Sequence, residues 1–83
     1  MYNIVFSMVS DTSHRNTYTA EHDSTDIVDI AQRFGRAESG ELVELLSVDG
    51  ADTSRDDIPA AGWDSQYQKY RRRVKGPTGW EWR

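Results

Sequence analysis

The sequence predicts an α+β domain: an antiparallel sheet of four to five strands with one helix packed on one face, in the order β-β-α-β-β-β. Two observations predict it. Residues 24–34 place apolar side chains at helical spacing, and the segments on either side alternate apolar and polar residues as strands do. The chain has 83 residues, which suffices for a single domain, residues 1–83, with one modest core.

The helix is expected over residues 24–34, STDIVDIAQRF. Its apolar residues fall at i, i+3, i+4 and i+7 and make one stripe: Ile27, Ile30, Ala31 and Phe34. Asp23, Ser24 or Thr25 can cap the start, and Gly35 is expected to end the helix in a left-handed conformation. A helix of about eleven residues is marginal alone in water, so a sheet must cover this stripe.

The clearest strand pattern is residues 2–9, YNIVFSMV, because Tyr2, Ile4, Phe6 and Met8 alternate onto one face. A polar loop over residues 10–16 leads to a second strand at residues 17–22. A loop this short favours an antiparallel hairpin.

Residues 41–48, ELVELLSV, fit either a strand or a short helix. We favour a strand, because glycine-containing turn signals bracket the segment. Such a strand has a face of mixed polarity: Leu42, Glu44, Leu46 and Val48. Residues 49–62 are expected to form a long loop of small and acidic residues.

Residues 66–75, QYQKYRRRVK, are expected to form a strand that a Gly-Pro-Thr-Gly turn joins to residues 80–83. Tyr70 and Val74 lie on one side of this strand. The other side carries an aromatic residue and four cations, which are the candidate binding residues: Tyr67, Lys69, Arg71, Arg73 and Lys75. A cationic stripe of this kind matches phosphates or acidic protein surfaces.

Trp80 and Trp82 in the last strand can add stacking against nucleic-acid bases. The alternative is that both tryptophans belong to the core and that the cations form a solvated face. Docking on this stripe requires that the arginines lie neither under the helix nor against the chain's own aspartates.

The charge is unevenly distributed. Residues 21–57 are strongly acidic, residues 66–83 are basic, and the formal net charge is -4. This split indicates an interaction protein, or two segments that neutralise each other in the fold. Four aspartates of the expected loop could imitate nucleic-acid phosphates: Asp49, Asp52, Asp56 and Asp57. Ordinary solubility is the favoured explanation, because true mimics usually carry a larger net charge than -4.

The sequence shows no pattern of a catalytic, cofactor or metal site. It contains no cysteine, and its two histidines, His14 and His22, have no metal-ligand spacing. We therefore expect a protein without enzymatic activity, cofactor or metal. The apolar run near the N-terminus, residues 4–6, is too short for a signal peptide or a membrane span, so a cytoplasmic protein is expected.

The order of elements resembles that of several small phage-encoded inhibitors, the anti-CRISPR proteins of type I systems. The shared features are the first strand YNIVFSMV, the short strand TYTAEH, the helix STDIVDIAQRF, the strand ELVELLSV and a hairpin ending in Trp80 and Trp82. The resemblance implies a non-catalytic protein that binds a CRISPR surveillance complex and blocks guide-directed DNA recognition with charged surface residues. Residues 49–62 depart from it, and no motif matches residue by residue, so no site residue is carried over.

The sequence leaves three functions open. The first is an inhibitor or adaptor that binds a host nucleoprotein or nuclease by charge complementarity. The second is a nucleic-acid-binding module that uses the basic hairpin. The third is a homo-oligomeric structural protein, paired through a sheet edge at residues 17–22 or 66–75. Like charges disfavour self-pairing of residues 66–75, so the other edge is preferred.

Overall fold

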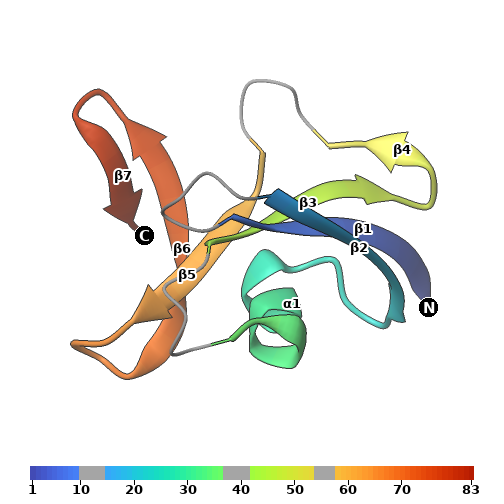
Figure 1. The fold of residues 1–83 in the computed structure, drawn as a ribbon, viewed down its shortest axis with the longest axis horizontal. Coiled ribbons are helices and arrows are strands. Elements are labelled where there is room, and N and C mark those ends of the chain that lie inside the picture. Colours follow the sequence, from blue (N-terminus) through green and yellow to red (C-terminus); the bar gives the residue numbers. More distant parts are fainter. Residues whose placement is uncertain (10–14, 37–41, 54–57) are drawn as a thin grey trace.

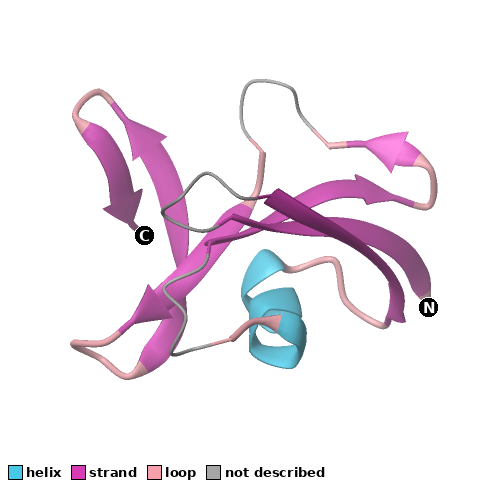
Figure 2. Cartoon of the chain, in the orientation of Figure 1, coloured by secondary structure: helices cyan, strands magenta, loops and turns pink. Residues whose placement is uncertain are grey.

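Residues 1–9, 15–36, 42–53 and 58–83 are described by the computed structural model of the chain (Figure 1). The elements in chain order are β1 (Tyr2–Val9), β2 (Arg15–His22), α1 (Ile27–Phe34), β3 (Leu42–Val48), β4 (Ala51–Asp52), β5 (Ala60–Asp64), β6 (Lys69–Gly76) and β7 (Gly79–Trp82). The helix lies against one side of the sheet (Figure 2). The α+β class with one helix is confirmed, whereas the sheet has more strands than the four to five predicted.

The described strands form one sheet in the order β2-β1-β3-β5-β6-β7, and β4 pairs with β3 outside this order. All of these pairs are antiparallel. β1 and β2 form the expected hairpin, in register from Tyr2 opposite His22 to Val9 opposite Arg15. β6 has β5 on one side and β7 on the other, so the predicted edge at residues 66–75 is wrong. β2 is a terminal strand of the sheet, which agrees with the edge at residues 17–22 that the sequence analysis preferred.

The helix begins later than predicted because Asp26 is its N-cap. Asp26 Oδ1 accepts a hydrogen bond from Val28 N at 2.9 Å. Ser24 supports this cap, since its hydroxyl accepts from Asp26 N at 3.1 Å and donates to Asp29 Oδ2 at 3.0 Å. The cap predicted within residues 23–25 is therefore displaced to Asp26.

Gly35 ends the helix, but not in the left-handed conformation that was predicted. Its φ is -71° and its ψ is 161°, which any residue adopts, and its N–H donates to Ala31 O at 2.8 Å. The position needs glycine for space. A Cβ atom there would lie 2.6 Å from both Ala31 O and the Tyr70 hydroxyl. The missing side chain allows the end of α1 to pass close to β6.

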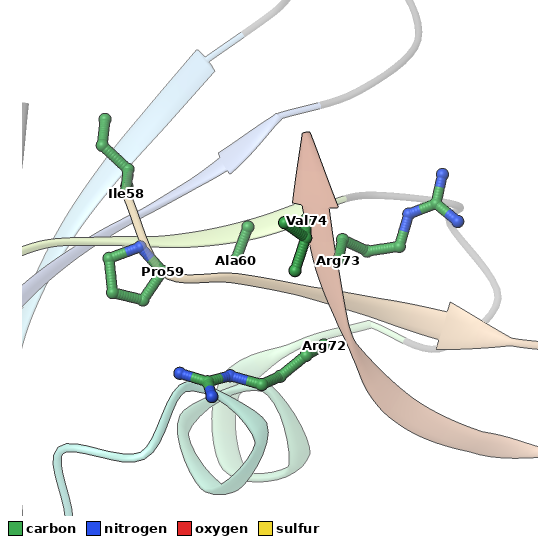
Figure 3. A pocket seen from close by; sticks show the side chains of 6 residues that line it. All are labelled: Ile58, Pro59, Ala60, Arg72, Arg73 and Val74. Atoms are coloured by element: carbon green, nitrogen blue, oxygen red, sulfur yellow. The ribbon is translucent and has the colours of Figure 1, made fainter. Parts of the chain in front are cut away.

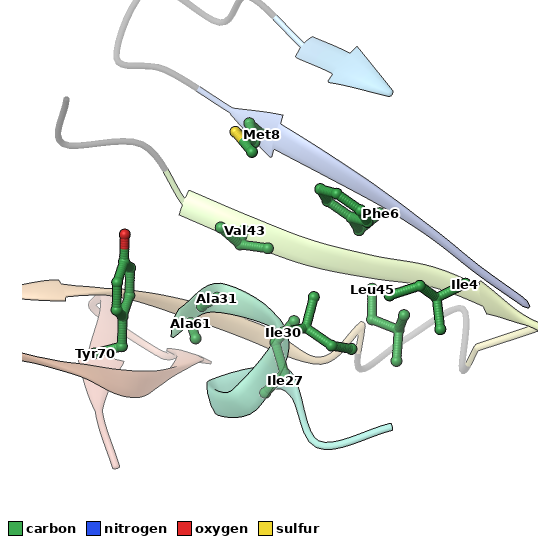
Figure 4. Close-up of a cluster of buried hydrophobic side chains, with 10 residues drawn as sticks. All are labelled: Ile4, Phe6, Met8, Ile27, Ile30, Ala31, Val43, Leu45, Ala61 and Tyr70. Carbon is green, nitrogen blue, oxygen red and sulfur yellow. The ribbon is translucent and has the colours of Figure 1, made fainter. Parts of the chain in front are cut away.

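The core lies between α1 and the sheet (Figure 4). It contains Ile4, Phe6, Met8, Ile27, Ile30, Ala31, Val43, Leu45, Ala61 and Tyr70. Three residues of the predicted helical stripe are fully buried, and Phe34 packs against the core from its border. The Phe34 ring lies 5.0 Å from that of Phe6 and 5.6 Å from the edge-on ring of His22. The predicted role of the stripe is thus confirmed.

β3 confirms the strand interpretation for residues 42–48, and the structure shows which of its side chains face the core. Val43 and Leu45 are buried in the core. The pairing of β3 with β1 skips Leu46, so this residue forms a β-bulge that reverses the alternation. Thr53 satisfies the bulged backbone: its N–H donates to Leu46 O at 3.0 Å, and its hydroxyl lies 2.8 Å from Leu45 O.

The prediction of one long loop over residues 49–62 is wrong. Asp49 and Gly50 make a tight turn with φ of 50° and 82°, β4 follows directly, and β5 begins at Ala60. β5 has the sequence AAGWD, whose small residues show no alternation of apolar and polar side chains. Residues 54–57 lie outside the described residues.

Candidate binding surface on the C-terminal hairpin

β6 presents its candidate cations on the side of the sheet that faces away from α1. Tyr70 is 7% exposed and packs in the core, so strand alternation directs Lys69, Arg71 and Arg73 to the other side. Figure 3 shows Arg72 and Arg73 leaving β6 in opposite directions. The candidate arginines therefore do not lie under the helix.

The turn between β5 and β6 places Tyr67 beside these cations. Asp64 ends β5, and its Oδ1 accepts a hydrogen bond from Gln66 N at 3.0 Å, which closes the turn. Gln68 has a left-handed φ of 54° immediately before β6 begins. Tyr67 is thus a turn residue rather than the strand residue that was predicted, and it is 59% exposed.

Rings and guanidinium groups alternate across this face in what we call the cation–aromatic ladder, which consists of Tyr67, Arg71, Trp82 and Arg73. The Arg71 guanidinium carbon lies 5.0 Å from the centroid of the Tyr67 ring and 5.9 Å from that of Trp82. The Arg73 guanidinium carbon lies 4.1 Å from the Trp82 centroid. Lys69 Nζ adds a contact of 5.9 Å to Tyr67. These separations fall within the range of cation–π attraction, about 6 Å.

Strand register explains the ladder. Arg73 is directly opposite Trp82 in the β6–β7 pair, and Arg71 is opposite Gly62 in the β5–β6 pair. A Cβ atom at Gly62 would lie 3.6 Å from Trp82 Cη2 and 3.5 Å from Arg73 Cγ, so the indole extends over the glycine. Trp82 is 36% exposed and lies outside the core cluster. For Trp82, the alternative of a core tryptophan is therefore wrong.

Asp64 holds the Arg71 side chain of the ladder in place. Its Oδ2 accepts a hydrogen bond from Arg71 Nη1 at 2.9 Å, and its side chain is 6% exposed. Burial raises the pKa of the Asp64 carboxyl, but hydrogen bonds from Arg71 and from the N–H groups of Gln66 and Tyr67, with the charge of Arg71, bring the pKa below its ordinary value of 3.8. Asp64 is therefore ionised at neutral pH and holds the Arg71 guanidinium.

The ion pair changes the interpretation of Arg71. Docking on the stripe required arginines that are not held by the chain's own aspartates, and Arg71 does not meet this condition. Arg71 is a fixed, locally neutralised spacer between two rings. Among the described residues, Lys69 and Arg73 make no ion pair, so they contribute positive charge that Asp64 does not neutralise.

Three further positions complete the comparison with the predicted surface. The side chains of Lys75 and Trp80 lie outside the described residues, and the backbone register sets them opposite each other. Asp64 is absent from the candidate residues predicted from the sequence. The spacing of Asp64 and Arg71 indicates a pair only once β5 is known to lie beside β6.

A pocket of about 130 Å³ opens where β5 begins, and it lies beside the ladder because Arg73 borders both (Figure 3). Its lining is formed by Ile58, Pro59, Ala60, Arg72, Arg73 and Val74. Pockets that enclose small-molecule ligands measure about 300–1,000 Å³. This pocket is smaller than such ligand sites.

The acidic segment offers less to a partner than its sequence indicates. Asp49 Oδ1 accepts a hydrogen bond from Asn3 N at 2.8 Å, and Asp49 N donates to Asn3 O at 2.7 Å. Asp49 thus fastens β1 to the turn after β3. Asp52 belongs to β4, and Asp56 and Asp57 lie outside the described residues. Asp49 is consequently no longer a candidate for a phosphate-like acidic loop.

Within the part of the chain that the structure describes, His22 and the helix give no further site. His22 has a side chain that is 14% exposed, with Nδ1 3.8 Å from Asp23 Oδ1, and His14 lies outside the described residues. Across the described ranges, no group of three or more His, Asp or Glu side chains could hold a metal ion. Within the same ranges, no helix has the length and apolar character needed to cross a membrane.

Comparison with known proteins yields no relative. No protein-family model matches the chain, and neither a curated protein nor a solved structure matches it. The functional argument consequently depends on the geometry of the hairpin.

Proposed function

We propose that the chain is a small non-enzymatic inhibitor that docks its cation–aromatic ladder on an acidic surface of a host protein or nucleoprotein in the cytoplasm. One observation carries the proposal: the Arg73 guanidinium lies 4.1 Å from the Trp82 ring, and the exposed Tyr67 lies at the other end of the same ladder. The resemblance to phage-encoded anti-CRISPR proteins supports a CRISPR surveillance complex or another nuclease as the target.

The composition of the ladder favours a protein interface. Tryptophan, tyrosine and arginine are the residues that dominate binding energy when they are truncated to alanine. Neighbouring rings hold the Arg71 and Arg73 side chains, so that less conformational entropy is lost on docking. Stacking occupies the face of a guanidinium and leaves N–H groups for a carboxylate or phosphate. Arg73 is therefore the expected centre of charge recognition.

The test compares two adjacent arginines of β6. The Arg73→Glu variant reverses a charge on the ladder face, and Arg72→Glu makes the same change on the opposite face of the same strand. Each variant and the wild type are immobilised and exposed to lysate of the native host. The proposal predicts a partner captured by the wild type and by Arg72→Glu but not by Arg73→Glu. Identical partner lists for all three proteins would exclude the ladder from binding.

Direct nucleic-acid binding is the second candidate, and the exposed Tyr67 ring favours it as a stacking platform. Because Asp64 neutralises Arg71, the cations left for phosphate contacts are Lys69, Arg73 and Lys75. Three contacts predict a slope of about -2 to -3 for log affinity against log salt concentration. Fluorescence anisotropy with labelled single-stranded DNA or RNA measures it, and no binding at low salt would eliminate this candidate.

A further inference from the structure

Within the described residues, the edge of the sheet formed by β2 is long, regular and unpaired. β2 pairs with β1 over eight consecutive residues without a bulge, and no other described strand pairs with it. A terminal strand of this length presents a row of backbone N–H and C=O groups to its surroundings. Its sequence, RNTYTAEH, contains no proline, glycine or lysine, which are the residues that commonly block such an edge.

The opposite edge is formed by a shorter strand next to a tight turn. β7 has four residues, and the tight turn that precedes it consists of Pro77 and Thr78. Its first residue, Gly79, has a φ of 122°. A short strand next to such a turn offers few positions for a second chain. β2 is therefore the edge of the described sheet that is open to addition of a strand.

The residues of β2 are complementary to themselves in one antiparallel register. With a twofold axis through Tyr18, Thr17 of each copy lies opposite Thr19 of the other. The same register sets Arg15 of each copy opposite Glu21 of the other, so both ends have opposite charges at paired positions. Thr17–Thr19 pairs flank the axis, Asn16–Ala20 pairs separate them from the charged ends, and no two like charges are paired within this register of β2.

Tyr18 lies on the axis of this arrangement. Its ring stacks on Phe6 at 5.6 Å but remains 38% exposed, because β1 covers one side of it and the free edge leaves the other side open. Two such rings on adjacent strands would form the cross-strand aromatic pair that stabilises antiparallel sheets. We propose that the β2 edge binds a second copy of the chain in this register and joins two sheets across the twofold axis.

This inference is independent of the proposed function, because β2 and the ladder lie at opposite ends of the strand order. A dimer through β2 leaves both ladders accessible and presents two docking surfaces on one particle. A single pair of strands is smaller than a standard protein interface, so association is expected only at high concentration, up to about 1 mM.

The test uses two double variants at the same exposed positions. Thr17→Lys with Thr19→Lys places like charges opposite each other across the axis, whereas Thr17→Lys with Thr19→Glu places opposite charges there. Sedimentation equilibrium is measured from about 10 µM to about 1 mM. The wild type should dimerise with increasing concentration, the Lys/Lys variant should dimerise about tenfold more weakly, and the Lys/Glu variant at least as well as the wild type.

A control with the same charge change removes net charge as an explanation. Gln32→Lys with Thr78→Lys alters two exposed positions away from β2 and should dimerise as the wild type does. Circular dichroism confirms that each variant is folded. A wild type that stays monomeric at about 1 mM, or a Lys/Glu variant as weak as the Lys/Lys variant, would overturn the proposal.

The absence of cysteine provides a second, register-specific measurement. Tyr18→Cys introduces a single thiol on the axis, where directly opposite Cα atoms are about 4.5–5.5 Å apart, within the range of a disulfide. Mild oxidation should convert this variant to a covalent dimer much faster than a Thr78→Cys control. Equal rates of dimer formation would contradict the Tyr18-centred register.

Discussion

Gly35→Ala tests how closely the end of α1 approaches β6. A Cβ atom at this position would lie 2.6 Å from Ala31 O and 2.6 Å from the Tyr70 hydroxyl. Real Cβ atoms essentially never lie within 3.0 Å of another heavy atom, so each contact must lengthen by at least about 0.4 Å. Ala31 and Tyr70 both belong to the core, so neither can move without disturbing its packing.

Whether Gly35→Ala lowers or raises the free energy of unfolding shows which of two effects dominates, overpacking or restriction of the unfolded chain. Overpacking a closed site costs about 1–3 kcal/mol, whereas replacing glycine by alanine without strain stabilises by about 0.4–1 kcal/mol through the unfolded chain. Because the φ of Gly35 suits alanine, the close contacts alone decide the outcome. We expect the free energy of unfolding to fall by about 1–2 kcal/mol and the melting temperature by about 5–15 °C.

Urea denaturation followed by tryptophan fluorescence measures this change. Gly62→Ala is the matched control, because its Cβ atom would meet its neighbours at ordinary contact distances, the shortest being 3.5 Å. That variant should be as stable as the wild type or up to about 1 kcal/mol more stable. A Gly35→Ala variant that is equally or more stable than the wild type would refute the close approach of α1 to β6.

Three further predictions concern the helix, the core and the ladder. Asp26→Ala removes the N-cap and should lower the free energy of unfolding by about 1 kcal/mol in urea denaturation, whereas Asp23→Ala, which lies before the cap, should change it little. Ile30→Val deletes one methylene from a side chain that is 0% exposed and should cost about 0.5–1.5 kcal/mol in the same assay. The lowered pKa of Asp64 means that its carboxylate stabilises the fold fully above pH 3.8, and that this contribution is lost as the pH falls below 3.8 towards the lowered pKa. Urea midpoints measured from about pH 5 to about pH 2 should therefore fall less steeply for Asp64→Asn than for the wild type; equal slopes would show that Asp64 is not held by Arg71.

The elements with strong periodicity could be predicted from the sequence. The stripe of α1 and the alternation of β1 are long enough to specify which side chains are buried, because each side chain follows the period of its own element. The cap and the end of α1 could not be predicted in the same way. The Ser24 hydroxyl is hydrogen-bonded to Asp29. Gly35 is required because a side chain there would collide with Tyr70, a residue distant in the sequence.

The inward face of β3 could not be predicted, because a bulge at Leu46 reverses the alternation, and the bulge depends on pairing with β1 and on Thr53. β5 was missed because small residues pack well in its place between β3 and β6 without producing a pattern. Because β5 was not predicted, the ion pair between Asp64 and Arg71 could not be predicted either. Lys69, Arg71 and Arg73 were located correctly on the outer face of β6, whereas Tyr67 belongs to the turn before this strand. The contacts of Arg71 with Tyr67 and Trp82 depend on that turn and on β7.

The central claim is that the cation–aromatic ladder is the surface that binds a partner. Its most direct test is the affinity of the captured partner for Trp82→Ala, measured by titration calorimetry beside Tyr2→Ala, since Tyr2 is a comparably exposed ring on β1. We predict that Trp82→Ala weakens binding by about 2 kcal/mol or more, roughly thirtyfold, and that Tyr2→Ala leaves it unchanged. Equal affinity of the two variants and the wild type would contradict the claim.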